Sequence, residues 1–175
     1  MKPKINPDYC YYKLRLVKSP VHGWGVVAAE TIPKGRFVIE YTGEVMNRKR
    51  HKEVSAKRKR CYIYTLDKYW SLDGLVGGSG AERVNHSCDP NLRADIRGHR
   101  VFFVSRRKIK KGEELSVDYY YHWDLKDLSL CMCKAKNCRG TINFPPHGIR
   151  NTPAYLALRE RLESQRKRVE KRAIL

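Results

Sequence analysis

Four cysteines in this chain have the spacing of a metal site. Cys131, Cys133 and Cys138 lie within eight residues, and Cys88 stands in an earlier loop. A C-x-C pair can direct two sulfurs at one ion and a third cysteine can close back on it, which leaves one corner of a tetrahedron for Cys88. A closed shell of four thiolates has no position for water, so the spacing predicts one structural Zn²⁺ ion. The alternative is a set of surface thiols, which are prone to oxidation.

The loop that carries Cys88 also carries two other groups that bind ligands. Asn85 and His86 precede the cysteine, and Asp-Pro-Asn follows it. Proline disfavours helix at the residue before it, and Asn and Pro favour turns, so residues 83–91 are predicted to form a polar loop. Loops often carry binding sites. Asn85 and His86 are therefore candidate binding residues, and the alternative for His86 is a role in the core or in bracing the loop.

Short strands and turns must position these groups, because the body of the chain shows little helical periodicity. Runs of β-branched and aromatic residues alternate with Gly and Pro, which is typical of strands joined by turns. The predicted strands are residues 9–19, 26–29, 37–41, 61–66, 70–72, 100–105 and 115–121. Residues 46–60 have the composition of a helix or a mobile basic insert, and the glycine-rich residues 74–80 must form a turn or a flexible connection.

A helix without a competing alternative is predicted only near the C-terminal end. Thr152 is a suitable N-cap, and Pro153 suits the first helical position. The helix carries a partial apolar stripe formed by Leu156, Leu158, Leu162 and Val169. The sequence therefore predicts a mainly β protein with a C-terminal helix, and a length of 175 residues suits one domain with a terminal extension.

The charge of the chain predicts a polyanionic partner. The net charge is +19, and basic residues concentrate at residues 48–60 and 159–172. This excess favours nucleic acid or another acidic surface, whereas the alternative is a solvated face that maintains solubility. With no apolar run near the roughly 20 residues of a membrane span and no signal-peptide core, we expect a soluble, non-secreted protein without a membrane partner. Cys10 and Cys61 stand alone and are interpreted as structural or incidental thiols.

Four motifs, in this order, resemble the SET-domain protein lysine methyltransferases. They are Gly23-Trp24-Gly25-Val26, Glu40-Tyr41-Thr42-Gly43-Glu44, Asn85-His86-Ser87-Cys88-Asp89-Pro90-Asn91 and Gly112-Glu113-Glu114-Leu115-Ser116-Val117-Asp118-Tyr119. The cysteine trio, followed by Arg139-Gly140, resembles the post-SET zinc module of that family. The similarity covers roughly residues 12–143, and the ordered set is far more specific than any one motif.

The resemblance implies a fold and a division of the chain. The fold is a set of small curved β-sheets with a C-terminal pseudoknot, in which the chain passes through a preceding loop, an arrangement that is unusual among folds. Residues 1–124 would form the SET domain, with the basic insert at about residues 46–60. Residues 125–145 would form the zinc-bound post-SET module, and residues 146–175 a basic helical extension.

The resemblance also implies methyl transfer from S-adenosylmethionine to the side-chain amine of lysine in a protein, and it assigns roles to residues of this chain. The cofactor-binding residues are Trp24, Gly25, Tyr62, Asn85 and His86. The catalytic residues are Tyr119 and Tyr41, and Tyr41 lines the substrate channel with Tyr64, Val117 and Tyr121. The zinc ligands are Cys88, Cys131, Cys133 and Cys138. For the tyrosines, the alternative is ordinary strand packing.

The implied chemistry accounts for these residue types. A lysine side chain has a pKa near 10.4, so at neutral pH it is protonated and not nucleophilic. An aromatic channel that ends at a positive sulfonium disfavours the ammonium form by desolvation and by like charge. The neutral amine then attacks the methyl group in line with the departing sulfur, and the main contribution of the protein is alignment.

The chain departs from the family pattern in three places. Glu82 and Arg83 stand where the family usually has an arginine and an aromatic residue before Val-Asn-His. Val117 stands where the family usually has Phe or Tyr, and its smaller size predicts that di- or trimethylation is sterically permitted. Only Cys10 precedes the SET motifs, so no cysteine-rich pre-SET module is expected.

Two functions are compared. The first is methylation of a histone or another DNA-associated basic protein, with the basic clusters engaging DNA or an acidic surface. The second is a catalytically weak or inactive, zinc-stabilised module that binds chromatin or nucleic acid. In either case we expect an intracellular protein, placed in the nucleus or on chromatin if it is eukaryotic or a host-directed effector, and otherwise in the cytoplasm.

Overall fold

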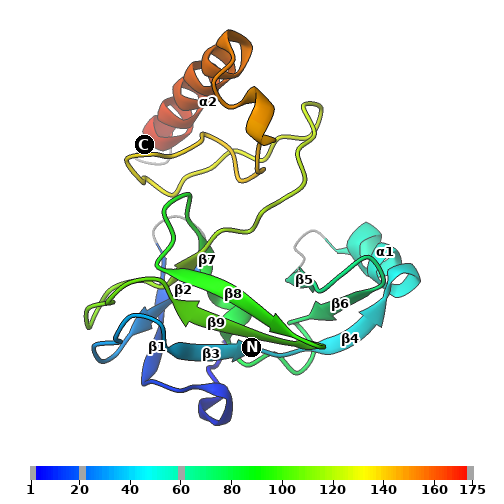
Figure 1. The fold of residues 1–175 in the computed structure, drawn as a ribbon, viewed down its shortest axis with the longest axis vertical. Helices are drawn as coiled ribbons and strands as arrows, with labels where there is room; N and C mark the ends of the chain where they lie inside the picture. The colour runs from blue at the N-terminus through cyan, green and yellow to red at the C-terminus, as the bar shows by residue number, and fades with distance from the viewer. Residues whose placement is uncertain (1–2, 20–22, 59–61, 173–175) are drawn as a thin grey trace. The chain divides into compact units, whose positions relative to one another are not determined.

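The computed structural model describes residues 3–19, 23–58 and 62–172 (Figure 1). The chain divides into two compact units, which we describe separately. Residues 1–85 and 91–116 belong to the first, here called the sheet unit, and residues 86–90 and 117–175 belong to the second, here called the cysteine unit. None of the helices in these described ranges combines the length and apolarity that a membrane span requires.

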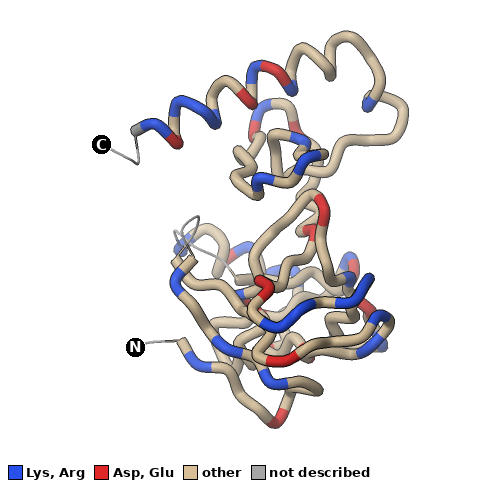
Figure 2. Tube along the Cα trace, turned by 90° about the vertical axis from the view of Figure 1, so that its left-hand side faces the viewer, with Lys and Arg blue, Asp and Glu red and all other residues tan. Residues whose placement is uncertain are grey.

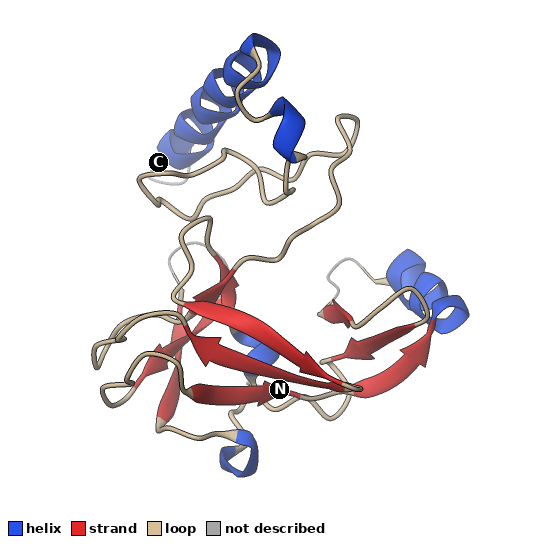
Figure 3. Ribbon diagram, in the orientation of Figure 1, coloured by secondary structure: helices blue, strands red, loops and turns tan. Residues whose placement is uncertain are grey.

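The sheet unit is built from short strands in small antiparallel sheets (Figure 3). One pair joins β1 (Leu14–Lys18) to β2 (Trp24–Ala28). One three-stranded sheet has the order β3 (Phe37–Tyr41), β9 (Arg100–Ser105), β8 (Leu92–Arg97). The other has the order β4 (Glu44–Asn47), β6 (Trp70–Asp73), β5 (Ile63–Thr65). The unit also contains two single 3₁₀ turns, η1 (Pro7–Tyr9) and η2 (Ala81–Arg83), and one helix that is described below.

The central strand β9 explains which strands the sequence revealed. It pairs on both edges, with β3 and with β8, and its residues from 101 to 105 are buried. A strand buried on both faces has a largely apolar sequence, which makes it recognisable. The predictions for residues 37–41 and 100–105 are confirmed by β3 and β9. Strands β4 and β8 were missed, because their polar residues outnumber the buried ones. The strand predicted at residues 115–121 is wrong beyond β10 (Ser116–Val117).

The basic insert forms helix α1 (Arg48–Lys57), which confirms the helical alternative. Asn47 caps it, because its side chain accepts a hydrogen bond from the Arg50 N–H at 2.9 Å. Val54 is the buried side chain of this helix within the described chain, so α1 lies on the surface. Cys61, interpreted above as an incidental thiol, lies outside the described residues.

The cysteine unit is held mainly by loops. Strand β7 (Asn85–His86) pairs with β10 where the chain passes between the units. The buried Asn143 donates from its amide to the His122 carbonyl at 2.6 Å and accepts from the Ser129 N–H at 2.8 Å. One 3₁₀ turn, η3 (His147–Ile149), leads to helix α2 (Pro153–Arg172). The pseudoknot that the resemblance implies stays a prediction.

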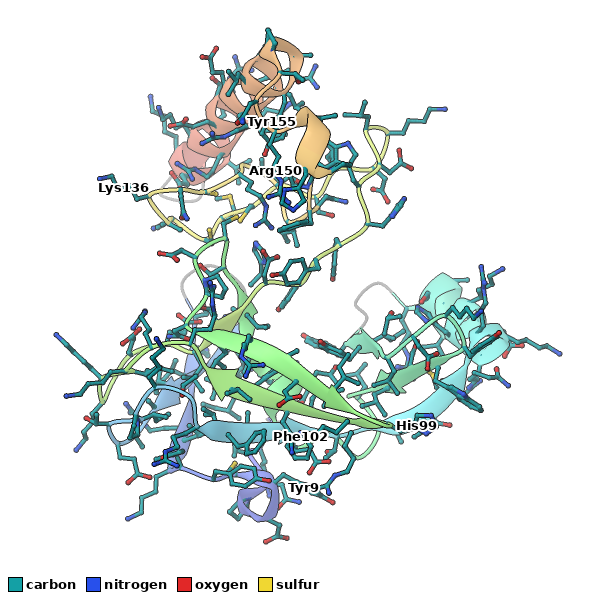
Figure 4. All side chains as sticks on the ribbon, viewed as in Figure 1. Tyr9, His99, Phe102, Lys136, Arg150 and Tyr155 are labelled. Carbon is teal, nitrogen blue, oxygen red and sulfur yellow. The ribbon has the colours of Figure 1, made fainter. Side chains whose placement is uncertain are left out.

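Helix α2 begins where the sequence predicted, but it packs through a different face. Thr152 caps it, accepting from the Tyr155 N–H at 3.3 Å, and Pro153 is its first residue. Among residues 153–171 its buried side chains are Tyr155, labelled in Figure 4, and Leu162, seven residues later. Leu156 and Val169 are exposed, so their place in the predicted stripe is wrong. The stripe was drawn through aliphatic residues alone, whereas the aromatic Tyr155 packs against Trp123 at 5.9 Å between ring centres.

Candidate functional site

The cysteine unit brings together the four cysteines that the sequence selected. Their sulfur atoms all lie within 4.8 Å of one another, and Cys88 Sγ is 3.8 Å from Cys131 Sγ and 4.0 Å from Cys138 Sγ. In Figure 4 sulfur atoms gather beside the loop that carries Lys136. Sulfurs placed 2.3 Å from a central ion in a tetrahedron are about 3.8 Å apart, so the cluster has the right size for one zinc ion. Each of the five cysteines that the structure describes is free of a disulfide.

Backbone N–H groups point at these sulfurs. The Arg139 N–H donates to Cys88 Sγ, the Gly140 N–H to Cys138 Sγ, and the Cys88 N–H to Cys133 Sγ, each at 3.4 Å. Hydrogen bonds to the charged form of a group favour that form, so these donors stabilise thiolates. Thiolates are the form of cysteine that binds metal ions. The donor set therefore fits a metal site better than a group of neutral thiols.

His86 braces this cluster. Its Nδ1 accepts a hydrogen bond from the Tyr119 N–H at 3.2 Å, so its Nε2 carries the ring proton. That Nε2 lies 3.5 Å from Cys88 Sγ and donates toward it. Burial lowers the pKa of His86 to about 4, although the charge of Asp118 acts in the opposite direction, and the ring is neutral as this geometry requires. The imidazole thus links a predicted zinc ligand to the backbone of the predicted catalytic tyrosine.

The cysteine unit also groups the predicted aromatic residues of its own part of the chain. Tyr119 packs edge-on against His86, with ring centres 5.3 Å apart, and lies 5.6 Å from the ring of Tyr121. The Tyr119 side chain is exposed and Val117 is buried. Tyr119 therefore has its backbone fixed while its ring reaches the surface of the unit.

Within the sheet unit, the predicted residues Trp24, Gly25 and Asn85 lie together. The Asn85 side-chain amide donates to Glu114 Oε1 at 2.7 Å and to the Trp24 carbonyl at 3.4 Å. A Cβ atom at position 25 would lie 2.4 Å from that same Glu114 oxygen, so a larger residue there would displace the Glu114 carboxylate from Asn85. Glu114 stands in one of the sequence motifs but was assigned no role there. Its place in the pair Glu113-Glu114 was the signal that could have identified it.

A second group in the sheet unit contains Tyr41, Tyr62 and Tyr64. The Tyr41 hydroxyl donates to the Tyr62 carbonyl at 2.6 Å, and the rings of Tyr41 and Tyr64 are 5.4 Å apart. Both rings also pack near Phe103, which the sequence had placed only in a strand. The structure thus brings these tyrosines together, and the strand-packing alternative accounts for part of their contacts.

The unusual pair before the polar loop is satisfied locally. Glu82 Oε2 accepts the Gly80 N–H at 2.8 Å, and its Oε1 pairs with Arg83 Nε at 3.2 Å. The Arg83 guanidinium lies 4.2 Å from the centre of the Tyr62 ring, where it makes a cation–π contact. The departure from the family pattern therefore places a charged pair against a predicted cofactor residue without leaving either charge uncompensated.

Both helices carry basic residues, which Figure 2 colours blue along the chain, and most of them are exposed. On α1 they are Arg48, Lys49, Arg50, Lys52 and Lys57, accompanied by one acid, Glu53. On α2 they include Arg161, Lys167, Arg168 and Lys171, interrupted by Glu160 and Glu163. The basic face of α1 is thus the less neutralised of the two.

Comparison with known proteins gives a consistent result. The SET domain family model matches residues 23–120. The chain is 37% identical over 139 residues to the histone-lysine N-methyltransferase trr of Drosophila melanogaster, which covers 73% of this chain and 6% of that protein. It is 34% identical over 139 residues to set-2 of Caenorhabditis elegans, covering 74% and 9%, and 32% identical over 144 residues to set1 of Dictyostelium discoideum, covering 75% and 9%. Both are also named histone-lysine N-methyltransferases, and the chain spans less than a tenth of the length of each of these three relatives.

Proposed function

The chain belongs to the SET domain family, and from that premise we propose that it transfers methyl groups from S-adenosylmethionine to lysine side chains of a protein. The observation that carries this proposal is the SET domain match over residues 23–120. The similarity to proteins named histone-lysine N-methyltransferases supports it. When bound, the cofactor supplies an electrophilic methyl group on its sulfonium. The chain's own residues bind and orient the two reactants.

Cofactor binding is proposed for Trp24, Gly25, Tyr62, Asn85 and His86. The amide of Asn85 commits its N–H donors to Glu114 and to the Trp24 carbonyl. This orientation presents Asn85 Oδ1 as an acceptor, which suits the ammonium group of the amino-acid portion of the cofactor. Gly25 is buried beside the Asn85 and Glu114 side chains, and its lack of a side chain leaves room for that pair next to the proposed cofactor site. For His86, both ring nitrogens already have partners, so its backbone or ring face would make the contact.

Catalysis is proposed for Tyr119 and Tyr41, with Tyr64, Val117 and Tyr121 lining the lysine channel. The Tyr41 hydroxyl donates its hydrogen bond to the Tyr62 carbonyl, so toward a substrate its oxygen acts as an acceptor. Such oxygens hold a neutral amine and polarise the transferring methyl through CH···O contacts worth about 0.5–1 kcal/mol each. Val117 is small for the family position, so we expect di- or trimethylated product. Mass spectrometry that finds only monomethyllysine contradicts this expectation.

One structural zinc ion is proposed at Cys88, Cys131, Cys133 and Cys138. The sulfur spacing and the three backbone donors support it. The ion would fix the loops of a unit that has few strands to hold it, and four thiolates leave no position for substrate or water.

The proposed substrate is a histone or another DNA-associated protein, acted on at chromatin. The names of the similar proteins support a histone, and the exposed basic face of α1 supports contact with DNA. DNA affinity is tested with two triple glutamine variants that remove equal charge: one at Arg48, Lys49 and Lys52 on α1, the other at Arg161, Lys167 and Arg168 on α2. We expect weaker binding with a smaller salt dependence than the wild type for the first variant alone, and equal losses for both would indicate a non-specific charge effect.

The decisive experiment for the activity is transfer of labelled methyl groups to histones and nucleosomes. Tyr119→Phe is compared with the wild type, and Tyr69→Phe, at an exposed position in a turn, is the matched control. We expect loss of transfer for the first variant only. If the wild type neither binds S-adenosylmethionine nor methylates any protein tried, the alternative holds, namely an inactive module that binds chromatin or nucleic acid.

A further inference from the structure

Asp118 and Arg139 form a buried ion pair in the cysteine unit. Arg139 Nη1 lies 2.7 Å from Asp118 Oδ2, and Arg139 Nη2 lies 3.0 Å from Asp118 Oδ1. The side chains are 5% and 14% exposed, for Asp118 and Arg139 respectively. A two-point bond between a guanidinium and a carboxylate fixes direction as well as distance. This pair therefore holds two segments of the unit in one orientation.

Each partner is adjacent in sequence to a residue of proposed function. Asp118 immediately precedes Tyr119, and Arg139 immediately follows Cys138. The Arg139 N–H donates to Cys88 Sγ, so its main chain is attached to the sulfur cluster. Its guanidinium also lies 5.0 Å from the centre of the Phe144 ring. The arginine is thus anchored on the cluster side before it reaches the aspartate.

The aspartate in turn fixes the backbone around Tyr119. Asp118 Oδ1 accepts a hydrogen bond from the Tyr120 N–H at 3.1 Å, and Tyr120 has a φ of 50°. This left-handed conformation is unfavourable for a residue other than glycine, so it needs support from its surroundings. On the other side, the Tyr119 N–H donates to His86. The backbone of Tyr119 is therefore held at both ends by groups that also contact the sulfur cluster or its arginine.

We propose that Asp118 and Arg139 are positioning residues for Tyr119. Through this ion pair, the presence or absence of zinc in the cysteine cluster sets the orientation of the Tyr119 ring. The inference rests on the proposed methyltransferase function. Neither residue needs to touch substrate or cofactor. Loss of the pair would turn the Tyr119 ring from its productive direction, and a displacement of about 1 Å at a reacting group can cost on the order of a hundredfold in rate.

The test compares Arg139→Gln, Arg139→Lys and Asp118→Asn with Arg97→Gln. Arg97 is the matched control, because it also pairs with an aspartate, Asp95, and lies over a phenylalanine ring, but on the exposed β8. For the three variants of the pair we expect kcat to fall by about 10- to 100-fold, while zinc content and the Kd for S-adenosylmethionine stay within about twofold. Arg97→Gln should keep the wild-type kcat.

A second-site variant separates positioning from general stability. Glycine adopts the left-handed backbone conformation of residue 120 without strain, so Tyr120→Gly makes the support from Asp118 less necessary. The double variant Asp118→Asn/Tyr120→Gly, measured against Tyr120→Gly alone, should therefore recover part of the kcat lost by Asp118→Asn. Unchanged kcat in Arg139→Gln, or a loss that follows zinc content, overturns the proposal. If the wild type is inactive on every substrate, the proposed function fails, and amide hydrogen exchange decides the positioning role. Faster exchange at residues 119 and 120 in zinc-loaded Arg139→Gln supports that role, and unchanged exchange refutes it.

Discussion

Replacing Arg58 by glutamine should destabilise the sheet unit through a buried carboxylate. Arg58 follows α1 directly, and its Nη1 lies 2.5 Å from Oδ2 of Asp73, at the end of β6. The Asp73 side chain is 0% exposed, whereas that of Arg58 is 31% exposed. The other Asp73 oxygen accepts the Leu75 N–H at 3.0 Å, which does not neutralise its charge. The variant therefore leaves a buried anion without its arginine.

The expected magnitude follows from burial. Removing one partner of a fully buried ion pair costs about 3–5 kcal/mol. Because Arg58 is partly exposed and solvent screens it, we expect about 2–3 kcal/mol. For a protein of this size, about 2–4 °C per kcal/mol predicts a melting temperature about 4–12 °C lower.

Thermal unfolding followed by circular dichroism at pH 7 measures this shift. Arg50→Gln is the matched control, because Arg50 lies on the same helix in an exposed pair with Glu53 at 3.8 Å and should change the melting temperature little. The double variant Arg58→Gln/Asp73→Asn should lose less stability than the sum of the single variants, because the stranded charge is gone. Equal melting temperatures for Arg58→Gln and Arg50→Gln would refute the reasoning.

Four further outcomes are expected. Removing the metal with a chelator should abolish methyl transfer, and full activity in protein shown by atomic emission to lack zinc contradicts the structural role. Gly25→Ala should weaken binding of S-adenosylmethionine in calorimetry, because its Cβ would lie 2.4 Å from Glu114 Oε1 and displace that carboxylate from Asn85; wild-type affinity contradicts this. Gly140→Ala should make α2 more sensitive to protease, since position 140 has a φ of +79° and the new Cβ would lie 2.9 Å from Leu162 Cβ; an unchanged digestion pattern counts against this. Burial raises the pKa of Cys10 from 9.0 to about 11, so at pH 8.5 peptide mapping should find it alkylated about a hundredfold more slowly than a free cysteine, with the rate rising as pH approaches 11.

Features that depend on neighbours in the chain were predictable. Phe37–Tyr41 and Arg100–Ser105 are rich in β-branched and aromatic residues, and Thr152-Pro153 is a local start signal for a helix. The cysteine spacing likewise selected the four sulfurs that lie together, because few residue types bind zinc and their positions can be read directly from the sequence. These four cysteines also carried part of the resemblance to the family.

Only the tertiary structure decided the features that join distant segments. The two-point bond of Arg139 to Asp118, the contact of Glu114 with Asn85 beside Gly25, and the pairing of Arg58 with Asp73 each join residues at least 15 positions apart. No sequence periodicity encodes such pairs, because each forms only after strands and loops have brought the two side chains together. The residues proposed to do the chemistry could thus be named from the sequence, whereas the residues that hold them in place became visible only in the fold.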